Sequence, residues 1–277
     1  MDLTNLNQIK EILKSHNMWA KKSLGQHFLM DKEALFSIVS AANLNKDDVV
    51  LEIGPGLGVL TSELVKHAKK VVAVEFDPNM IEVLKSTVPE DNLEVVREHV
   101  LKFNTTVLPK GYKIVANLPY YITSPILRNF LESALNKPSE IVFLIQKEVA
   151  ERVTARPGNM SVLAVAVQLY GDPEIVRIVP NTSFWPKPKV DSAIIKIDVF
   201  SKPRFDINEK LFFRIVKAGF GEKRKTLSNS LSGGLQIPKE EVIKILENLD
   251  FDIKLRAEEL SVEDWDKIYQ LIKEKLS

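Results

Sequence analysis

The sequence predicts an α/β protein in which a mostly parallel, doubly wound sheet of seven strands precedes a smaller all-α domain. From residue 48, short apolar runs alternate with segments of helical periodicity, which is the pattern of a parallel sheet with helices on both faces. The first apolar run ends in the glycine-rich turn EIGPGLG, residues 52–58. After residue 202 only helical patterns remain. We therefore place the domains at 1–202, with an N-terminal helical extension, and at 203–277.

The individual elements follow in order. Parallel strands are predicted at residues 49–54, 70–76, 93–98, 112–118 and 140–146, and two further strands, expected at an antiparallel edge, at 174–180 and 191–199. Helices are predicted over 59–68, 78–88, from about 124, over 147–155, and then over 208–220, 223–233, 238–249 and 261–276. Ser261 and Asp264 have the spacing of a capping box at the start of the last helix.

Composition excludes several classes of protein. The 277 residues are 45% hydrophobic and 27% charged, as in a globular protein with a sizeable core. No apolar stretch approaches the ~20 residues of a membrane helix, and the polar N-terminus is not a secretory signal. The absence of cysteine excludes disulfides and thiolate metal sites and fits a cytoplasmic location. The four histidines lack metal-ligand spacing, so we expect no metal.

A nucleoside cofactor is indicated by the turn after the first strand. Gly54, Gly56 and Gly58 allow a tight turn and close approach of a ligand to the main chain. Glu75 ends the second strand, where a carboxylate can accept both hydroxyls of a ribose. This pattern resembles class I S-adenosylmethionine-dependent methyltransferases, which have a Rossmann-like sheet. NAD(P) is the competing interpretation, but its fingerprint has the spacing G-x-G-x-x-G.

The segment NLPY, residues 117–120, follows the fourth strand. Asn117 offers a side-chain carbonyl, Leu118 a backbone carbonyl outside the strand ladder, and Tyr120 a flat ring, which together suit an exocyclic amine on a planar base. The alternative is a strand end and a proline turn with both tyrosines packed. Tyr121 is expected to pack in the helix that follows and is given no role in catalysis.

Several longer motifs strengthen the resemblance. They are KKSLGQHFL (21–29), LEIGPGLGVLT (51–61), VANLPYYITSPI (115–126), QKEVAERV (146–153), FWPKPKVDSAI (184–194), GFGEKRKTLSNSL (219–231) and RAEELS (256–261). Together they resemble the small-subunit rRNA adenine N6-dimethyltransferases of the KsgA type, over nearly the whole chain. The resemblance implies dimethylation of two adjacent adenines in the 3′-terminal hairpin loop of 16S rRNA, with S-adenosylmethionine as cofactor.

The resemblance also implies site residues. Cofactor contacts fall on His27, Leu29, Gly54, Gly56, Glu75, His99 and Asn117. Contacts to the target base fall on Asn117, Leu118 and Tyr120, with Phe184 as the second ring of an aromatic clamp. Lys223, Arg224 and Lys225 would meet RNA phosphates. The implied partner is the immature small (30S) subunit, bound by a monomer in the cytoplasm without metal or membrane.

Two histidines depart from the family pattern. His27 stands where the family often has asparagine, and both can donate a hydrogen bond. His99 replaces an acid that accepts a bond from the amine of the cofactor's adenine; a neutral imidazole can accept one such bond, an imidazolium cannot. We therefore expect cofactor affinity to fall as the pH drops through the titration of the histidine. The alternative is that Glu98 or a water supplies the acceptor.

A basic segment supports contact with RNA. Residues 214–225 carry five basic side chains and one acidic one, whereas residues 238–277 carry seven basic and eleven acidic ones, within a net charge of +1. On charge alone, an ordinary solvated helix end is the favoured interpretation of this segment; the resemblance makes contact with RNA phosphates the favoured one. Two other functions are weighed: a binding module that checks small-subunit assembly with weak or dispensable methylation, and a DNA adenine methyltransferase, which more often carries D-P-P-Y.

Overall fold

The computed structural model describes residues 1–19 and 26–276. Residues 21–25 of the first motif lie outside the described part of the chain. The chain forms two compact units. The first is Met1–Glu151 with Asp172–Ser201, and the second is Arg152–Gly171 with Lys202–Ser277. The segment 152–171 thus groups with the C-terminal helices, and the functional domains at 1–202 and 203–277 remain a prediction.

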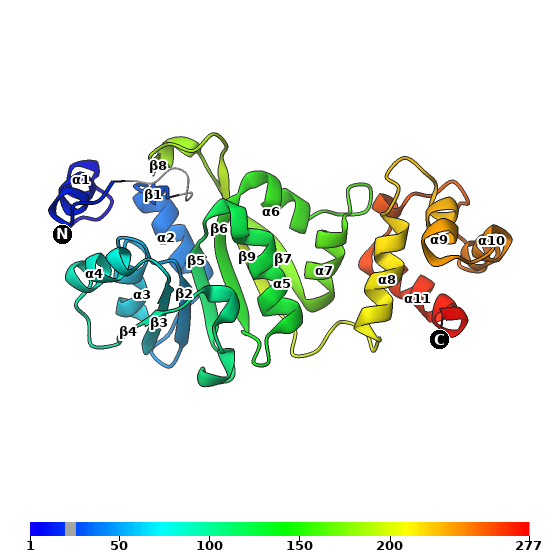
Figure 1. Ribbon diagram of the computed structural model, residues 1–277, viewed down its shortest axis with the longest axis horizontal. Coiled ribbons are helices and arrows are strands. Elements are labelled where there is room, and N and C mark those ends of the chain that lie inside the picture. Colours follow the sequence, from blue (N-terminus) through cyan, green and yellow to red (C-terminus); the bar gives the residue numbers. More distant parts are fainter. Residues whose placement is uncertain (20–25, 277) are drawn as a thin grey trace. The chain divides into compact units, whose positions relative to one another are not determined.

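The first unit contains the predicted sheet of seven strands, in the order β4-β3-β2-β5-β6-β9-β7 (Figure 1). Its strands are β2 (Val49–Ile53), β3 (Lys70–Glu75), β4 (Leu93–Arg97), β5 (Lys113–Asn117), β6 (Glu140–Gln146), β7 (Gly171–Val179) and β9 (Ser192–Val199). The first five are parallel, and β9 is antiparallel to β6. All seven predicted strands, and the predicted change of direction at this edge, are confirmed.

The central strands are apolar because both of their faces are covered. In β6 the five residues from Ile141 to Ile145 have no exposed surface. Such a continuous run of β-branched and aromatic side chains is typical of a buried parallel strand. The resulting core fixes the register of the sheet and therefore the positions of the loops at its edge.

The direction of winding reverses between β2 and β5. From β2 the chain proceeds to β3 and β4 on one side, and from β5 it proceeds to β6 on the other. Because such crossovers are right-handed, helices of the two halves cover opposite faces and leave a crevice beyond the carboxyl ends of β2 and β5. Gly54 follows β2 at this point, and Asn117 ends β5.

Side-chain caps start several helices of this unit. The helices are α1 (Leu6–Ser15), α2 (Lys32–Ala41), α3 (Thr61–His67), α4 (Pro78–Thr87), α5 (Thr123–Arg128) and α6 (Lys147–Val153), whose last two residues fall in the second unit. Asp31 accepts hydrogen bonds from the N–H groups of Glu33 and Ala34, both at 3.0 Å, and so satisfies free donors of α2. Asp77 caps α4, whose first residue is Pro78.

A short antiparallel ribbon was not predicted. Strand β1 (Phe28–Leu29) pairs with β8 (Phe184–Trp185), and the ring of Phe28 stacks on that of Trp185 with centroids 6.4 Å apart. Each strand has two residues, so neither carries a periodic signal in the sequence. The ribbon joins the segment before the sheet to the segment between its last two strands.

The second unit is helical. It comprises α7 (Val162–Tyr170), α8 (Glu209–Gly219), α9 (Leu227–Leu235), α10 (Lys239–Asn248) and α11 (Val262–Leu276). Trp265 of α11 is fully buried, and a Cβ on Gly219 would lie 2.3 Å from its ring, so α8 requires glycine there. Ser261 and Asp264 exchange hydrogen bonds at 3.1 Å, which confirms the predicted capping box. The helix predicted over 223–233 begins only at Leu227, after an exposed turn.

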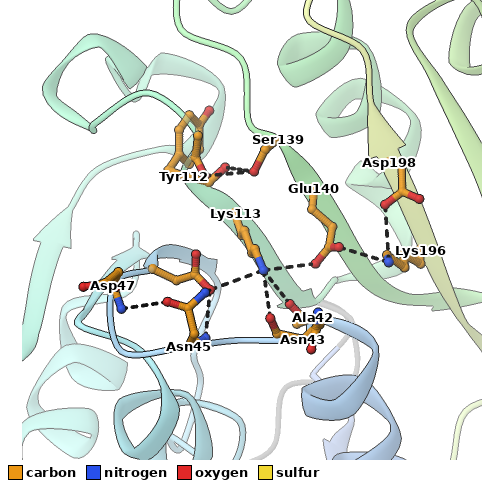
Figure 2. A network of polar contacts seen from close by, with 12 residues as sticks. Ala42, Asn43, Asn45, Asp47, Tyr112, Lys113, Ser139, Glu140, Lys196 and Asp198 are labelled. Carbon is orange, nitrogen blue, oxygen red and sulfur yellow. Dashed lines mark hydrogen bonds and ion pairs between the residues drawn. The ribbon is translucent and has the colours of Figure 1, made fainter.

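A polar network closes the opposite end of the sheet (Figure 2). Lys113, at the start of β5, donates to the carbonyl oxygens of Ala42 and Asn43, both at 3.0 Å. Its ammonium also lies 3.3 Å from Asp48 and 3.9 Å from Glu140. The network thereby fastens the end of α2 to the amino ends of the central strands, away from the glycine-rich turn.

Candidate functional site

A cavity of about 530 Å³ lies at the carboxyl ends of β2, β3 and β5. Nine of the predicted site residues border it. They are His27, Leu29, Gly54, Gly56, Glu75, His99, Asn117, Leu118 and Tyr120. These residues come from segments far apart in the chain, so the fold brings the predicted cofactor and target-base residues around one space.

The glycines of the turn after β2 divide into two kinds. Gly54 and Gly56 have φ of +64° and +57°, and a Cβ on Gly54 would meet nothing within 4 Å, so its backbone faces open space. Gly58 has φ of +87°, and a Cβ there would lie 2.7 Å from the Val88 side chain. Glycine is therefore needed at Gly58 for packing against α4, whereas Gly54 leaves room for a ligand beside the main chain.

Glu75 is held at the end of β3 by backbone N–H groups. Its Oε1 accepts hydrogen bonds from Phe76 at 2.6 Å and Asp77 at 2.8 Å. Burial raises the pKa of this carboxyl, while the backbone N–H groups of Asp77, Phe76 and Gly56 oppose the rise. A carboxylate fixed in this way beside a glycine turn has the arrangement that accepts ribose hydroxyls.

Asn117 and Leu118 present oxygen acceptors at the end of β5. The Asn117 side-chain nitrogen donates to the carbonyl oxygen of His27 at 3.5 Å, and among the described residues no partner is found for its Oδ1. Leu118 lies just beyond the strand, and its N–H donates to the carbonyl of Leu144 at 3.1 Å. The N–H groups of the Asn117 side chain and of the Leu118 main chain thus have partners within the protein, whereas the side-chain oxygen of Asn117 and the main-chain oxygen of Leu118 remain as acceptors at the cavity.

The ring of Tyr120 is fixed from both of its ends. Its hydroxyl lies 2.7 Å from Ser192 Oγ, and its ring stacks on the imidazole of His27, with centroids 5.6 Å apart and an interplanar angle of 24°. His27 in turn donates through Nδ1 to the carbonyl oxygen of Pro186 at 2.5 Å. Burial raises the pKa of the Tyr120 phenol, so the ring remains neutral.

His99 presents a different hydrogen-bonding group from the expected one. Its Nδ1 accepts the N–H of Leu101 at 3.3 Å and caps the short helix Val100–Lys102. In the neutral ring, the hydrogen must then reside on Nε2, which is a donor. The one acceptor nitrogen of the neutral ring, which the prediction assigned to the adenine amine, is therefore already used by Leu101.

Phe184 does not border the cavity. Its side chain is 2% exposed and packs in the apolar core from its position in β8, opposite Leu29. A clamp formed by this ring is absent from the arrangement seen in the described residues. The sequence could not show this, because burial of Phe184 depends on the unpredicted β1–β8 pairing.

The residues that border the cavity but were not predicted as site residues include Glu52, Phe76 and Tyr121. Phe76 is 68% exposed and meets the edge of His99 with ring centroids 6.0 Å apart. Tyr121 is 66% exposed, so the expectation that it packs in the following helix is wrong. Tyr121 lies in the short helix Tyr120–Ile122 and borders the cavity with an exposed side chain.

The charge of the cavity selects the kind of ligand. Four acidic residues border it, Glu52, Glu75, Asp77 and Glu98, and the lining contains no lysine or arginine among the residues that the structure describes. Dinucleotides carry phosphates, which this surface would repel. S-adenosylmethionine has no phosphate and carries a sulfonium and an ammonium, so its ribose fits Glu75 and its positive charges fit the acidic lining.

The predicted RNA-binding residues are exposed in the second unit. Lys223, Arg224 and Lys225 occupy the turn between α8 and α9, and Arg214 and Lys217 are exposed on α8. Lys225 is paired with Glu222 at 2.7 Å, also at the surface. Both side chains of this pair are exposed to solvent, so the interaction is weak. With three basic side chains against one acidic one, the turn remains positively charged.

Two kinds of feature are absent from residues 1–19 and 26–276. No helix there has the length and apolar character to span a bilayer. No cluster of three histidine or acidic side chains in this part of the chain has the arrangement of a metal site.

Comparisons with known proteins agree with this geometry. The family model "Ribosomal RNA adenine dimethylase" matches residues 17–274. The chain is 44% identical over 285 residues to ribosomal RNA small subunit methyltransferase A of Clostridioides difficile, covering 99% of this chain and 98% of the relative.

Solved structures show the same fold. A dimethyladenosine transferase from Plasmodium falciparum has a TM-score of 0.76 and 31% identity, covering 89% of this chain and 98% of its own. The 23S rRNA methyltransferase ErmE has a TM-score of 0.71 and 28% identity, covering 88% and 99%. The sheet is therefore the Rossmann-like sheet of class I methyltransferases, and the chain belongs to the S-adenosylmethionine-dependent ribosomal RNA adenine dimethylase family.

Proposed function

We propose that this protein dimethylates N6 of two adjacent adenines in the 3′-terminal hairpin loop of 16S rRNA during ribosome biogenesis. The observation that carries the proposal is one cavity bordered by both Gly54 and Glu75 on the cofactor side and Asn117, Leu118 and Tyr120 on the substrate side. Loop adenines suit such a site because they unstack at low cost, whereas paired bases hide their edges.

The chain's own contribution to the reaction is polarisation of the adenine amine. The lone pair of this amine is delocalised into the base, which makes it a poor nucleophile. Oδ1 of Asn117 and the carbonyl oxygen of Leu118 would accept its two N–H hydrogens and so favour a pyramidal nitrogen with a localised lone pair. Because the Asn117 nitrogen already donates to His27, the side-chain oxygen is oriented toward the cavity without reorganisation.

Tyr120 would hold the base in this position. Its hydroxyl is used by Ser192 and its ring is supported by His27, so its role is to present a fixed aromatic face. S-adenosylmethionine supplies an electrophilic methyl group on sulfur. Holding the two reactants together converts a bimolecular transfer into an effectively intramolecular one, which requires neither a metal nor a strong base from the protein.

The cofactor-binding roles follow from the same lining. Glu75 would accept the ribose hydroxyls of the cofactor. Gly54 and Gly56 would leave room for its amino-acid end, which His27 and Leu29 would border. His99 would face the adenine end as a donor through Nε2, which suits a ring nitrogen of the base. Phe184 would join the base clamp only if its side chain left the core.

Substrate binding would use the basic turn of the second unit. Lys223, Arg224 and Lys225 are exposed and would neutralise rRNA phosphates. We propose that the protein acts as a cytoplasmic monomer on the immature 30S particle, since the target loop must still be accessible there.

The proposal is tested by incubating the protein with S-adenosylmethionine labelled in its methyl group. The acceptors are small subunits lacking the methylations, mature methylated small subunits and duplex DNA. Transfer only to the first, with dimethyladenosine found at adjacent loop positions by mass spectrometry, is expected. Transfer to duplex DNA would refute it, and tight subunit binding without transfer would indicate an assembly-checking protein instead.

A further inference from the structure

Tyr121 is an exposed aromatic residue at the cavity that the proposed function does not use. Its side chain is 66% exposed, although it borders the cavity together with Tyr120. Among the described residues, its hydroxyl has no hydrogen-bond partner and its ring stacks on no other ring. An aromatic ring that lacks partners within the protein and borders a ligand site is open to contact by the ligand.

Tyr120, the preceding residue, has a different environment. Its hydroxyl lies 2.7 Å from Ser192 Oγ, and its ring stacks on that of His27. The two tyrosines are the first residues of the short 3₁₀ helix Tyr120–Ile122, and successive side chains leave such a helix about 120° apart. The two rings therefore do not face each other as the two sides of one clamp, and they suit two different bases.

The proposed substrate supplies a second base at this place. Its two target adenines are adjacent, so when one of them enters the cavity the other remains one nucleotide away and has lost a stacking neighbour. Tyr121 follows β5, as Asn117 and Leu118 do, whereas the cofactor residues Gly54 and Glu75 stand at the ends of β2 and β3. The exposed ring is therefore on the side of the cavity that would receive RNA.

We propose that Tyr121 is the stacking platform for the base of the second adenine while the first adenine occupies the cavity. This inference rests on the proposed function. An aromatic side chain restores to the second base the stacking that it loses when its neighbour is extruded, and it does so without reading sequence, because every base has an aromatic face. The contact stabilises the opened loop, so it acts on capture of the RNA and leaves cofactor binding unchanged.

The test compares removal of the ring with removal of the base. Unmethylated small subunits are reconstituted with rRNA in which an abasic nucleotide replaces one adenine of the pair, at each position in turn, and transfer to the remaining adenine is followed. On the intact pair, Tyr121→Ala should lower kcat/KM roughly 10- to 100-fold. For at least one abasic position, the wild type should lose a similar factor and Tyr121→Ala should lose nothing further.

Three control variants isolate the ring. Tyr121→Phe keeps the aromatic face and should retain the wild-type kcat/KM. Tyr121→Leu keeps an apolar side chain without that face, should lose as much as Tyr121→Ala, and replaces it in the test if the alanine variant does not fold. Phe36→Ala removes a ring of α2 that is 73% exposed and does not border this cavity, and it should change nothing. Calorimetry of S-adenosylhomocysteine binding should give the same affinity for all of these proteins.

The outcomes separate the two proposals. Wild-type protein that transfers no methyl group to intact unmethylated subunits would refute the proposed function itself. Normal transfer by Tyr121→Ala, or losses that multiply when the variant meets either abasic substrate, would overturn the role of Tyr121 alone. Binding of S-adenosylhomocysteine that is tenfold weaker in Tyr121→Ala would assign the ring to the cofactor, which also overturns the inference.

Discussion

The side-chain amide of Asn117 donates to the main-chain carbonyl of His27 at 3.5 Å, across ninety residues of sequence. The same histidine stacks on Tyr120 and donates to Pro186. One residue before β1 thus orients the acceptor at the end of β5 and the aromatic ring that follows it. The proposed polarisation of the adenine amine depends on this arrangement, because an amide that turned over would present a donor instead.

Replacing Asn117 by alanine is expected to lower kcat by about 10²- to 10³-fold, the usual effect of losing one preorganised group that stabilises the transition state. Binding of unmethylated subunits should be nearly unchanged, since the phosphate contacts are elsewhere. The measurement is single-turnover methyl transfer alongside filter binding of the same subunits. Substantial remaining turnover would refute the role of Asn117 as an amine acceptor.

Gly54 and Gly58 are expected to fail in different ways when changed to alanine. Gly58→Ala should destabilise the protein by about 1–3 kcal/mol, because its Cβ would meet the side chains of Val88 and Leu84 at 2.7 and 3.0 Å in a left-handed backbone conformation. In Gly54→Ala the new Cβ would meet no atom within 4 Å, so the protein should be destabilised less than by Gly58→Ala. The same Cβ would lie in the cavity and should weaken cofactor binding.

Chemical denaturation and calorimetry of S-adenosylhomocysteine binding measure the two effects on both variants. If Gly58→Ala lost cofactor affinity at unchanged stability, the division between a packing glycine and a ligand glycine would be wrong.

Neutralising Lys223, Arg224 and Lys225 with glutamine should weaken subunit binding and reduce the slope of log affinity against log salt by about 2, if each side chain contacts phosphate. A matched control removes three exposed lysines from the acidic part of the same unit, Lys239, Lys244 and Lys254. This control has the same change in charge and should leave the slope nearly unchanged. Equal slopes for the two triple variants would mean that the turn is an ordinary solvated surface.

Glu52 should make the ligand-free protein less stable as the pH rises. Its pKa is raised to about 8 when folded, from 4.5, so the folded state holds the proton more tightly than the unfolded state. The stabilisation is complete below about pH 4.5 and is lost through pH 8, at no more than about 1.4 kcal/mol per pH unit. Glu52→Gln should flatten this part of the profile of unfolding free energy, whereas Glu247→Gln, at an exposed position, should not.

The strands of the sheet were predictable because each has a local signal. In β6, the five residues between Glu140 and Gln146 are all apolar, which is the local pattern of a buried strand. Near the site, Gly54 and Pro119 mark the points where β2 and β5 end. The glycine turn, Glu75 and NLPY stand at the carboxyl ends of β2, β3 and β5, which are neighbours in the sheet, so the topology of a doubly wound sheet brings them to one edge.

The remaining features depend on contacts between distant segments. The β1–β8 ribbon buries Phe184, and only its pairing register reveals this. The helix α7, which was not predicted, is apolar on almost all sides, so it lacks the amphipathic period by which helices such as α8 and α10 were predicted. The hydrogen bond from Leu101 to His99 is local in sequence but depends on backbone geometry. The sequence shows that residue 99 is a histidine, but it does not show which of the two ring nitrogens accepts the bond.

Lys113 is expected to stabilise the fold without affecting the chemistry. Its side chain is 14% exposed and bonds to two carbonyls at the end of α2 and to the acids Asp48 and Glu140 (Figure 2). Lys113→Met removes the cation that the half-buried carboxylates of Asp48 and Glu140 face, and leaves the carbonyl of Ala42 without its donor, which should cost about 3 kcal/mol of unfolding free energy. The network lies at the amino ends of the strands, so methyl transfer per folded molecule should stay close to the wild-type value.

The pH dependence of the unfolding free energy of Lys113→Met tests whether the ion pairs of Lys113 cause the loss of stability. Burial raises the pKa of Glu140, and Lys196 and then Lys113 oppose the rise, so removing Lys113 should raise that pKa further. Protonation of Glu140 then removes the negative charge that Lys113 no longer compensates, and the loss of stability should be smaller at pH 5 than at pH 8. A loss that did not change with pH would show that the contacts to Ala42 and Asn43, and not the ion pairs, carry the contribution of Lys113.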